Sequence, residues 1–243
     1  RAGGIKDYLY FQFAQSQFKE GKNDAAVSVF REIQKQYPQS KYAEGSQFMI
    51  GWINFQSGKY EEAIDAYTIL YMRYNNKTSV PLAYYSIGDS YYNMGAYDSA
   101  IVNYKKIIDN YPHSELIYDA MNGIQYSYVA KGQPEKAIKL IDDFIANNPS
   151  LHNADQIYYK KAEIWYSQDK FKQAAQGYRD FIAKFTASKL YPDAHYWLAK
   201  SLMNQRDTIN AVYYLKTAAD KWMKSEIGFS SVIELGRIYQ NSR

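Results

Sequence analysis

Aromatic and polar residues recur along the chain at a spacing that suits the binding of another chain molecule. Positions 37 residues apart are mostly aromatic, namely Phe11, Phe48, Tyr85, Asn122, Tyr159 and Tyr196. Aromatic faces supply a large contact area at a low cost in conformational entropy. Carboxylate and amide groups nearby, such as Asp89 and Asn93, are able to pair with the N–H groups of a peptide. The pattern predicts noncovalent recognition of an extended ligand.

The residues that fall outside the expected packing positions define a candidate partner-binding groove. It comprises Trp52, Tyr85, Asp89, Asn93, Asn122, Tyr126, Tyr159, Glu163, Tyr196 and Lys200. For each aromatic residue the alternative is a place in the packing between repeats, and this is the better interpretation of Phe11 and Phe48. A glycan-binding module is the alternative function. Rings that lie flat and open to solvent would favour sugar stacking, whereas pockets separated by polar groups would favour a peptide.

Catalytic chemistry has little support in the sequence. The three histidines, His113, His152 and His195, do not recur in phase with one another, and the chain contains no cysteine. A catalytic triad or a metal site needs several groups that converge on one cavity. We therefore expect no enzyme activity, no cofactor and no metal site, with two solvated histidines and one, His195, packed in the fold.

A repeat of 37 residues organises the whole chain. Alanine stands at the same place in six consecutive repeats, as Ala26, Ala63, Ala100, Ala137, Ala174 and Ala211. Five residues before each alanine is a turn position, which is occupied by Gly21, Gly58, Gly95 and Gly132 and then by Asp169 and Arg206. Glycine suits the left-handed residue that closes a helix. We therefore expect the last two turns to be less regular than the first four.

Each repeat contains two amphipathic helices. Ala100, Tyr104, Ile107, Ile108 and Tyr111 follow the helical period. The helix before each turn carries a small residue that lets its partner approach closely. These small residues are Ala14, Gly51, Gly88, Ala162, Ala199 and Gly236, with Gln125 as the exception. Because a lone helical hairpin cannot bury both faces, the repeats must stack. The predicted fold is all-α, a right-handed α-solenoid with no strands.

The period also predicts where the helices lie. First helices are expected at about residues 6–20, 43–57, 80–94, 116–131, 153–168, 190–205 and 228–241. Second helices are expected at about 22–36, 59–74, 96–110, 133–147, 170–185 and 207–222. These helices give one solenoid over residues 1–243, with units at about 6–42, 43–79, 80–115, 116–152, 153–189 and 190–227. The lone first helix at 228–243 is either a cap or the start of a further repeat, and its apolar residues favour the second.

The repeat resembles the tetratricopeptide repeat. The third unit supplies the family's large, small and aromatic positions as Tyr84, Ile87, Gly88, Tyr91, Ala100, Tyr104 and Pro112. The resemblance implies a protein-interaction scaffold whose concave groove is lined by the first helices. Phe48, Trp52, Tyr85 and Asp89 stand where carboxylate-binding members of the family have lysine and asparagine, so a carboxylate clamp is not expected.

The longer period and the "YPxS" endings of two repeats resemble a subgroup of the family in bacterial envelope lipoproteins, of the outer-membrane assembly and Tol-Pal coordinator type. These endings are Tyr37-Pro38-Gln39-Ser40 and Tyr111-Pro112-His113-Ser114. The resemblance implies a periplasmic or outer-membrane-associated location, with a cytoplasmic one as the alternative.

Charge and hydropathy restrict the class of partner. The net charge is only +4, and the candidate groove mixes acidic with basic residues, which argues against nucleic acid. No apolar run is long enough to span a bilayer, so direct membrane insertion is not expected. The expected partner is an extended segment of a protein, and self-association stays open.

Overall fold

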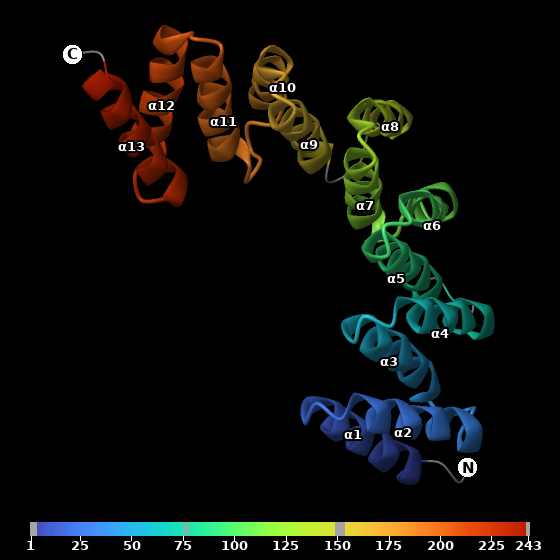
Figure 1. The fold of residues 1–243 in the computed structure, drawn as a ribbon. Helices are drawn as coiled ribbons and strands as arrows, with labels where there is room; N and C mark the ends of the chain where they lie inside the picture. Colours follow the sequence, from blue (N-terminus) through green and yellow to red (C-terminus); the bar gives the residue numbers. More distant parts are fainter. Residues whose placement is uncertain (1–3, 75, 77, 149–153, 242–243) are drawn as a thin grey trace. The chain divides into compact units, whose positions relative to one another are not determined.

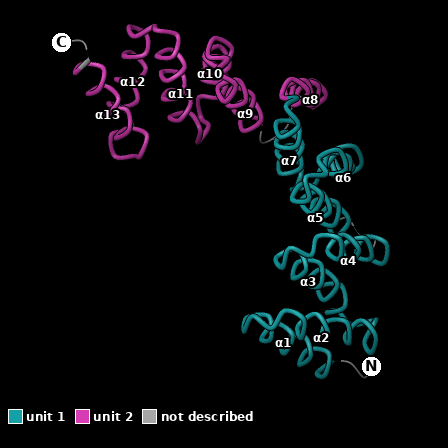
Figure 2. The backbone as a smooth tube through the Cα atoms, viewed as in Figure 1, with its two compact units in different colours: residues 1–133 teal, residues 134–243 magenta. Residues whose placement is uncertain are grey.

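The protein is described by a computed structural model that covers residues 4–74, 76, 78–148 and 154–241. This part of the chain forms thirteen α-helices and no strand (Figure 1). The chain divides into two compact units, residues 1–133 and residues 134–243 (Figure 2). The all-α fold of stacked helical hairpins is therefore confirmed.

The helices of the two units follow the expected repeat. Unit 1 contains α1 (Lys6–Lys19), α2 (Asn23–Gln36), α3 (Ala43–Gln56), α4 (Tyr60–Arg73), α5 (Ser79–Asn93), α6 (Tyr97–Asn110) and α7 (Ile117–Ala130). Unit 2 contains α8 (Pro134–Asn147), α9 (Ala154–Ser167), α10 (Phe171–Lys184), α11 (Tyr191–Asn204), α12 (Thr208–Trp222) and α13 (Glu226–Asn241). Every helix begins and ends within about two residues of its expected bound. One continuous solenoid with the repeat boundaries given above stays a prediction.

The alanine column lies on the buried faces of the second helices. All six alanines, from Ala26 to Ala211, have no exposed surface. In unit 1 the glycines at the small-residue position of the first helices lie directly against side chains of the second helices. A Cβ added to Gly51 would lie 2.6 Å from the Tyr67 ring. Gly236 differs, because an added Cβ there would meet nothing within 4 Å.

The turns within the hairpins are more uniform than the sequence predicts. The four turn glycines have φ angles between 68° and 76°, and Asp169 and Arg206 adopt the same left-handed conformation with φ angles of 57° and 64°. The N–H of Arg206 donates to the carbonyl of Met203 at 2.9 Å, as the N–H of Gly21 does to that of Phe18. The prediction of less regular turns is wrong, because the helix pair imposes its closing geometry on whichever residue occupies the position.

Serine residues fix the links between some of the hairpins. The hydroxyl of Ser40 donates to Asp7 Oδ2 at 2.6 Å, and that of Ser188 donates to Asp155 Oδ2 at 2.6 Å. Both bonds join a link to the first helix of the preceding hairpin. The equivalent segment of a later repeat, Phe185-Thr186-Ala187-Ser188, lacks the tyrosine and the proline of the "YPxS" motif but keeps the serine that makes the contact.

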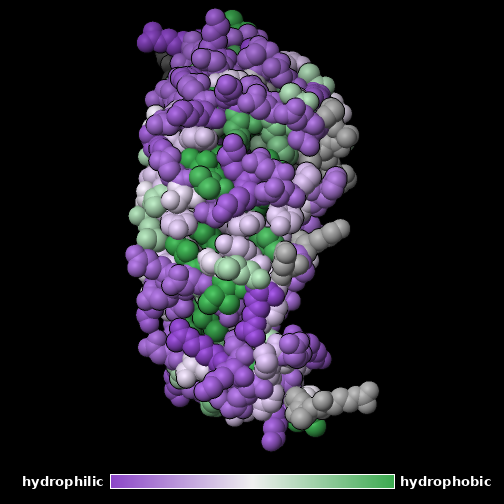
Figure 3. Space-filling view, turned by 90° about the vertical axis from the view of Figure 1, so that its right-hand side faces the viewer, coloured by the Kyte–Doolittle hydropathy of each residue, from purple (hydrophilic) through white to green (hydrophobic). Residues whose placement is uncertain are grey.

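The side of unit 1 on which α4 and α6 lie has hydrophobic side chains in small separate groups among hydrophilic ones (Figure 3). Ile69, Met72 and Val102 on these helices are about half exposed or more, at 47%, 71% and 54%. Scattered surface residues of this kind are normal in soluble proteins. The residues of the candidate groove all lie on first helices instead.

Candidate functional site

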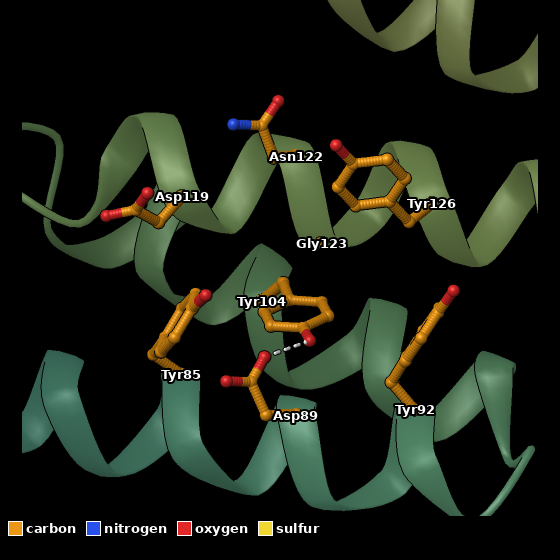
Figure 4. Close-up of a pocket in the computed structure, with 8 residues that line it drawn as sticks. All are labelled: Tyr85, Asp89, Tyr92, Tyr104, Asp119, Asn122, Gly123 and Tyr126. Carbon is orange, nitrogen blue, oxygen red and sulfur yellow. Dashed lines mark hydrogen bonds between the residues drawn. The ribbon is translucent and has the colours of Figure 1, made fainter.

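A pocket of about 270 Å³ lies between α5 and α7, with α6 behind it (Figure 4). Its lining consists of Tyr85, Asp89 and Tyr92 from α5, Tyr104 from α6, and Asp119, Asn122, Gly123 and Tyr126 from α7. On α5, the spacing of four and then three residues places these side chains on one face of the helix. Polar groups alternate with aromatic rings around this pocket.

Tyr104 forms the back wall and is held between two glycines. A Cβ added to Gly88 on α5 or to Gly123 on α7 would lie 2.5 Å from atoms of its ring. The Tyr104 hydroxyl donates to Asp89 Oδ1 at 2.6 Å (Figure 4). The two glycines therefore let the ring lie against both helices, and the hydrogen bond orients the Asp89 carboxylate.

The pocket is electrostatically negative. Burial raises the pKa of Asp89 to about 6, against the hydrogen bond from Tyr104, which lowers it, and with a smaller raising contribution from Asp119. Burial also raises the pKa of Asp119. The pKa of Tyr85 rises to about 12 because of burial and then of the two nearby carboxylates. Two carboxylates and no basic side chain stand among the eight lining residues.

The pocket unites four residues of the candidate groove. Tyr85, Asp89, Asn122 and Tyr126 all line it, and Tyr126 keeps 48% of its surface exposed. Asn93 lies one turn beyond Asp89 and is exposed, with its side-chain amide donating to the backbone carbonyl of Asp89.

The earlier aromatic positions take part in packing. Phe11 makes an edge-to-face contact with Phe30, and Phe48 lies against Tyr67, as the packing interpretation predicts. Trp52 is half-buried, and its ring meets that of Phe18 edge-to-face at a centroid distance of 4.9 Å. Part of Trp52 is thus used to join α1 with α3.

The candidate residues of unit 2 make contacts within that unit. Tyr159 is only 6% exposed, and its ring packs against Tyr178 and Phe181 at 5.4 Å. Its placement in an open groove is wrong, because the same helix face that would meet a ligand meets α10 here. The remaining three are half-buried and have partners within unit 2: Glu163 pairs with Lys160, Tyr196 packs on Trp197, and Lys200 pairs with Glu234.

Equivalent positions of the two units carry side chains of very different size. Residues 74 positions apart occupy equivalent places, and Trp197 stands in unit 2 where Gly123 stands in unit 1. The Trp197 ring meets Tyr166, the equivalent of Tyr92, edge-to-face at 4.9 Å. A large side chain therefore occupies the place that glycine leaves open between α5 and α7.

Four lining residues were missing from the candidate groove. Tyr92 and Tyr104 stand at packing positions of the repeat, Asp119 lies on the groove stripe of the first helices outside the ten candidate residues, and Gly123 has no role in the repeat pattern. The signal for Gly123 is present in the sequence, because the equivalent positions in neighbouring repeats carry Ser86 and Lys160. The absence of a side chain at one repeat position marks where a pocket opens.

The histidines and acidic groups show no catalytic arrangement in the described residues. His195 is buried, its Nδ1 lies 2.9 Å from the carbonyl oxygen of Tyr191, and burial lowers its pKa. His113 is exposed, and His152 lies outside the described residues. In the described ranges no group of three or more His, Cys, Asp or Glu side chains is arranged to hold a metal ion.

Comparisons with known proteins match these observations. The family model of an outer membrane lipoprotein, YfiO, matches residues 77–227, and two tetratricopeptide-repeat models match residues 8–40 and 45–68. A search of curated proteins found no match. None of the described helices is both long enough and apolar enough to cross a membrane.

Solved structures with a similar fold include three bacterial proteins. The C-terminal part of a tetratricopeptide-repeat protein from Cytophaga hutchinsonii has a TM-score of 0.61 at 16% identity, covering 86% of this chain and 78% of that one. PilF of Pseudomonas aeruginosa has a TM-score of 0.54 at 13% identity, covering 96% and 100%. The apo quorum sensor NprR of B. thuringiensis has a TM-score of 0.54 at 16% identity, covering 93% and 68%. At these identities the similarity shows the fold alone.

Proposed function

This chain belongs to the outer membrane lipoprotein family, and from that premise we propose that it is a non-enzymatic scaffold in the bacterial envelope. In this proposal it acts on the periplasmic side of the outer membrane and binds an extended segment of a partner protein. The first helices present the binding surface, and the pocket between α5 and α7 is its centre. The observation that carries the proposal is the convergence of Tyr85, Asp89, Asn122 and Tyr126 on that pocket.

The chemistry of the pocket suits a peptide. The side-chain amide of Asn122 and the carboxylates of Asp89 and Asp119 line the pocket together with the aromatic rings, and their oxygens are able to accept hydrogen bonds from peptide N–H groups (Figure 4). The helices that carry these groups are held by buried contacts, so little ordering is needed on binding. A sugar chain would instead need broad ring faces open to solvent, whereas Tyr85 is half-buried and Tyr104 is 1% exposed.

The binding surface is tested by paired substitutions. The tagged chain is used to recover partners from an envelope extract of the source cell, the bound segment is mapped with synthetic peptides, and Kd is measured by calorimetry. We expect the double variant Asn122→Ala with Tyr126→Ala to weaken binding about thirtyfold, as for the loss of a central anchor. The matched control is Tyr213→Ala, which removes a ring that is 64% exposed on the second helix α12.

The outcomes separate the alternatives. A loss of affinity in the double variant but not in Tyr213→Ala supports binding at the α5–α7 pocket. Equal affinity in all three proteins would place the interaction elsewhere. Binding of an N-acetylglucosamine oligomer in place of any peptide, with the same sensitivity to substitution, would establish the glycan-binding alternative.

A further inference from the structure

We propose that the pocket between α5 and α7 binds a lysine or arginine side chain of the partner's segment. This inference rests on the proposed function and adds the chemical class that the pocket selects. It follows from three features of the pocket: two carboxylates without a basic partner, aromatic walls, and a size suited to a single side chain.

The two carboxylates lack a compensating positive charge in the described part of the chain. None of the groups that shift the pKa of Asp89 or of Asp119 is a lysine or an arginine. Asp89 accepts one hydrogen bond from Tyr104, and that donor is neutral. A partly buried negative charge is costly unless it is paired. A cation brought by a ligand would supply the missing partner.

The aromatic residues provide the remaining surface for such a cation. Tyr85 and Tyr92 rise from α5 on either side of Asp89, and Tyr126 projects from α7 above them (Figure 4). The negative faces of aromatic rings attract ammonium and guanidinium groups, and the apolar stem of a lysine or arginine packs well on the same rings. A volume of about 270 Å³ is below the roughly 300–1,000 Å³ of pockets for drug-sized ligands, and suits one side chain.

At the equivalent positions of unit 2, the carboxylate already has a basic partner and a lysine replaces one of the tyrosines. Glu163, which is equivalent to Asp89, pairs with Lys160 at 2.6 Å. The equivalent of Tyr126 is Lys200, whose Nζ lies 3.0 Å from Glu234. The preceding repeat has Trp52 at the position of Asp89 and thus no carboxylate there. The unpaired acidic pocket is therefore a feature of one repeat, and its equivalents offer matched controls.

The experiment selects peptides from a random 12-residue display library on the purified chain. We expect the selected peptides to share a lysine or arginine at one aligned position. The tightest peptide is then synthesised with that residue and with norleucine, which keeps the apolar stem and removes the charge. We expect norleucine to weaken binding at least tenfold, the range of a charge-assisted hydrogen bond.

Substitutions in the protein identify where the cation is bound. Asp89→Asn and Asp119→Asn remove one charge each with little change in shape, and each is expected to weaken the lysine peptide about tenfold while leaving the norleucine peptide within twofold. The control is Asp193→Asn, at the position of unit 2 equivalent to Asp119, which should leave both affinities within twofold. Far-ultraviolet circular dichroism and melting curves establish that each variant is folded.

The results test the cation pocket separately from the peptide scaffold. Selected peptides without a shared basic residue, or equal binding of the norleucine peptide, would overturn the cation pocket and leave the peptide scaffold standing. Sensitivity to Asp193→Asn instead of the α5–α7 variants would also overturn it. If the folded chain selects no peptide at all, the proposed function fails and the cation pocket fails with it.

Discussion

Gly88 lies so close to the ring of Tyr104 that an added Cβ would be 2.5 Å from its Cε1 atom. Gly123 lies equally close to the same ring, with an added Cβ 2.5 Å from its Cζ atom, so α5 and α7 both confine the ring. The wall of the pocket and the packing of α5, α6 and α7 therefore depend on the same contact.

Gly88→Ala should destabilise unit 1. Overpacking of a buried contact costs about 1–3 kcal/mol, which exceeds the roughly 0.5–1 kcal/mol that alanine gains over glycine within a helix. The midpoint of urea unfolding is expected to fall. Gly45→Ala is the matched control, because its added Cβ would lie 3.7 Å from Phe11, an ordinary contact, and this variant should be slightly stabilised. Equal stability changes in the two variants would show that the ring of Tyr104 is free to move.

Arg206→Gly should stabilise the turn between α11 and α12. Arg206 has a φ of 64°, and the left-handed conformation costs a residue with a Cβ about 1–2 kcal/mol relative to glycine. The greater freedom of glycine in the unfolded chain reduces the gain, so we expect an increase of about 0.5–1 kcal/mol in the free energy of unfolding. The reverse change at an equivalent turn, Gly95→Arg, should lower it by a similar amount. A decrease in stability on Arg206→Gly would mean that the arginine side chain makes a compensating contact.

Asp89 should make the stability of unit 1 fall as the pH rises from about 4 to about 6. Its pKa is about 6 in the folded protein and has an ordinary value of 3.8, so the folded chain retains the proton over this window. The titratable groups around Asp89 are Tyr67 on α4, Tyr85 and Tyr92 on α5, Tyr104 on α6, and Asp119 and Tyr126 on α7.

The raised pKa of Asp89 corresponds to a loss of about 2–3 kcal/mol in the free energy of unfolding between pH 4 and pH 7. The Asp89→Asn variant lacks this loss because its side chain does not titrate. We therefore expect the Asp89→Asn variant to gain stability relative to the unchanged protein as the pH rises, measured by urea unfolding at matched pH values. Asp193→Asn is a comparison in unit 2, where the carboxyl also has a raised pKa because of burial. A constant difference between Asp89→Asn and the unchanged protein at all pH values would contradict the raised pKa of Asp89.

Tyr104→Phe should raise the pKa of Asp89 above 6. The Tyr104 hydroxyl donates to the carboxylate and favours its charged form, so its removal favours the protonated form. Carbon-13 NMR titration of the aspartate carboxyl groups measures this shift directly. Tyr92→Phe is the control, since no described hydrogen bond joins that hydroxyl to Asp89. A pKa that falls in Tyr104→Phe would mean that the hydroxyl does not donate to this carboxylate.

The repeat architecture could be predicted from the sequence because the same physical requirement recurs six times. Ala100 and its equivalents are buried in every repeat, so their period alone locates each second helix. The turns were less predictable, since Asp169 and Arg206 are unfavourable in the left-handed conformation and yet adopt it. Tertiary packing between paired helices outweighs the local preference of one residue.

The candidate site was predictable only in part. Periodicity places Tyr85 and Tyr159 at equivalent positions, but it does not report the side chain that stands opposite each of them. Tyr159 meets Phe181 and is buried, whereas Tyr85 borders the space beside Gly123. Whether a position is open depends on residues from two other helices, and this information is spread over about 40 residues of sequence.

The packing of unit 1 also has a consequence for how the protein folds. Helices that contact each other extensively, such as α5 with α6 and α6 with α7, follow each other directly in the sequence. Contacts that are close in sequence need little loop closure, and proteins dominated by them fold within microseconds to milliseconds. All the residues that line the pocket lie between Tyr85 and Tyr126. The pocket is therefore a local product of the chain, and it is complete once three consecutive helices have docked.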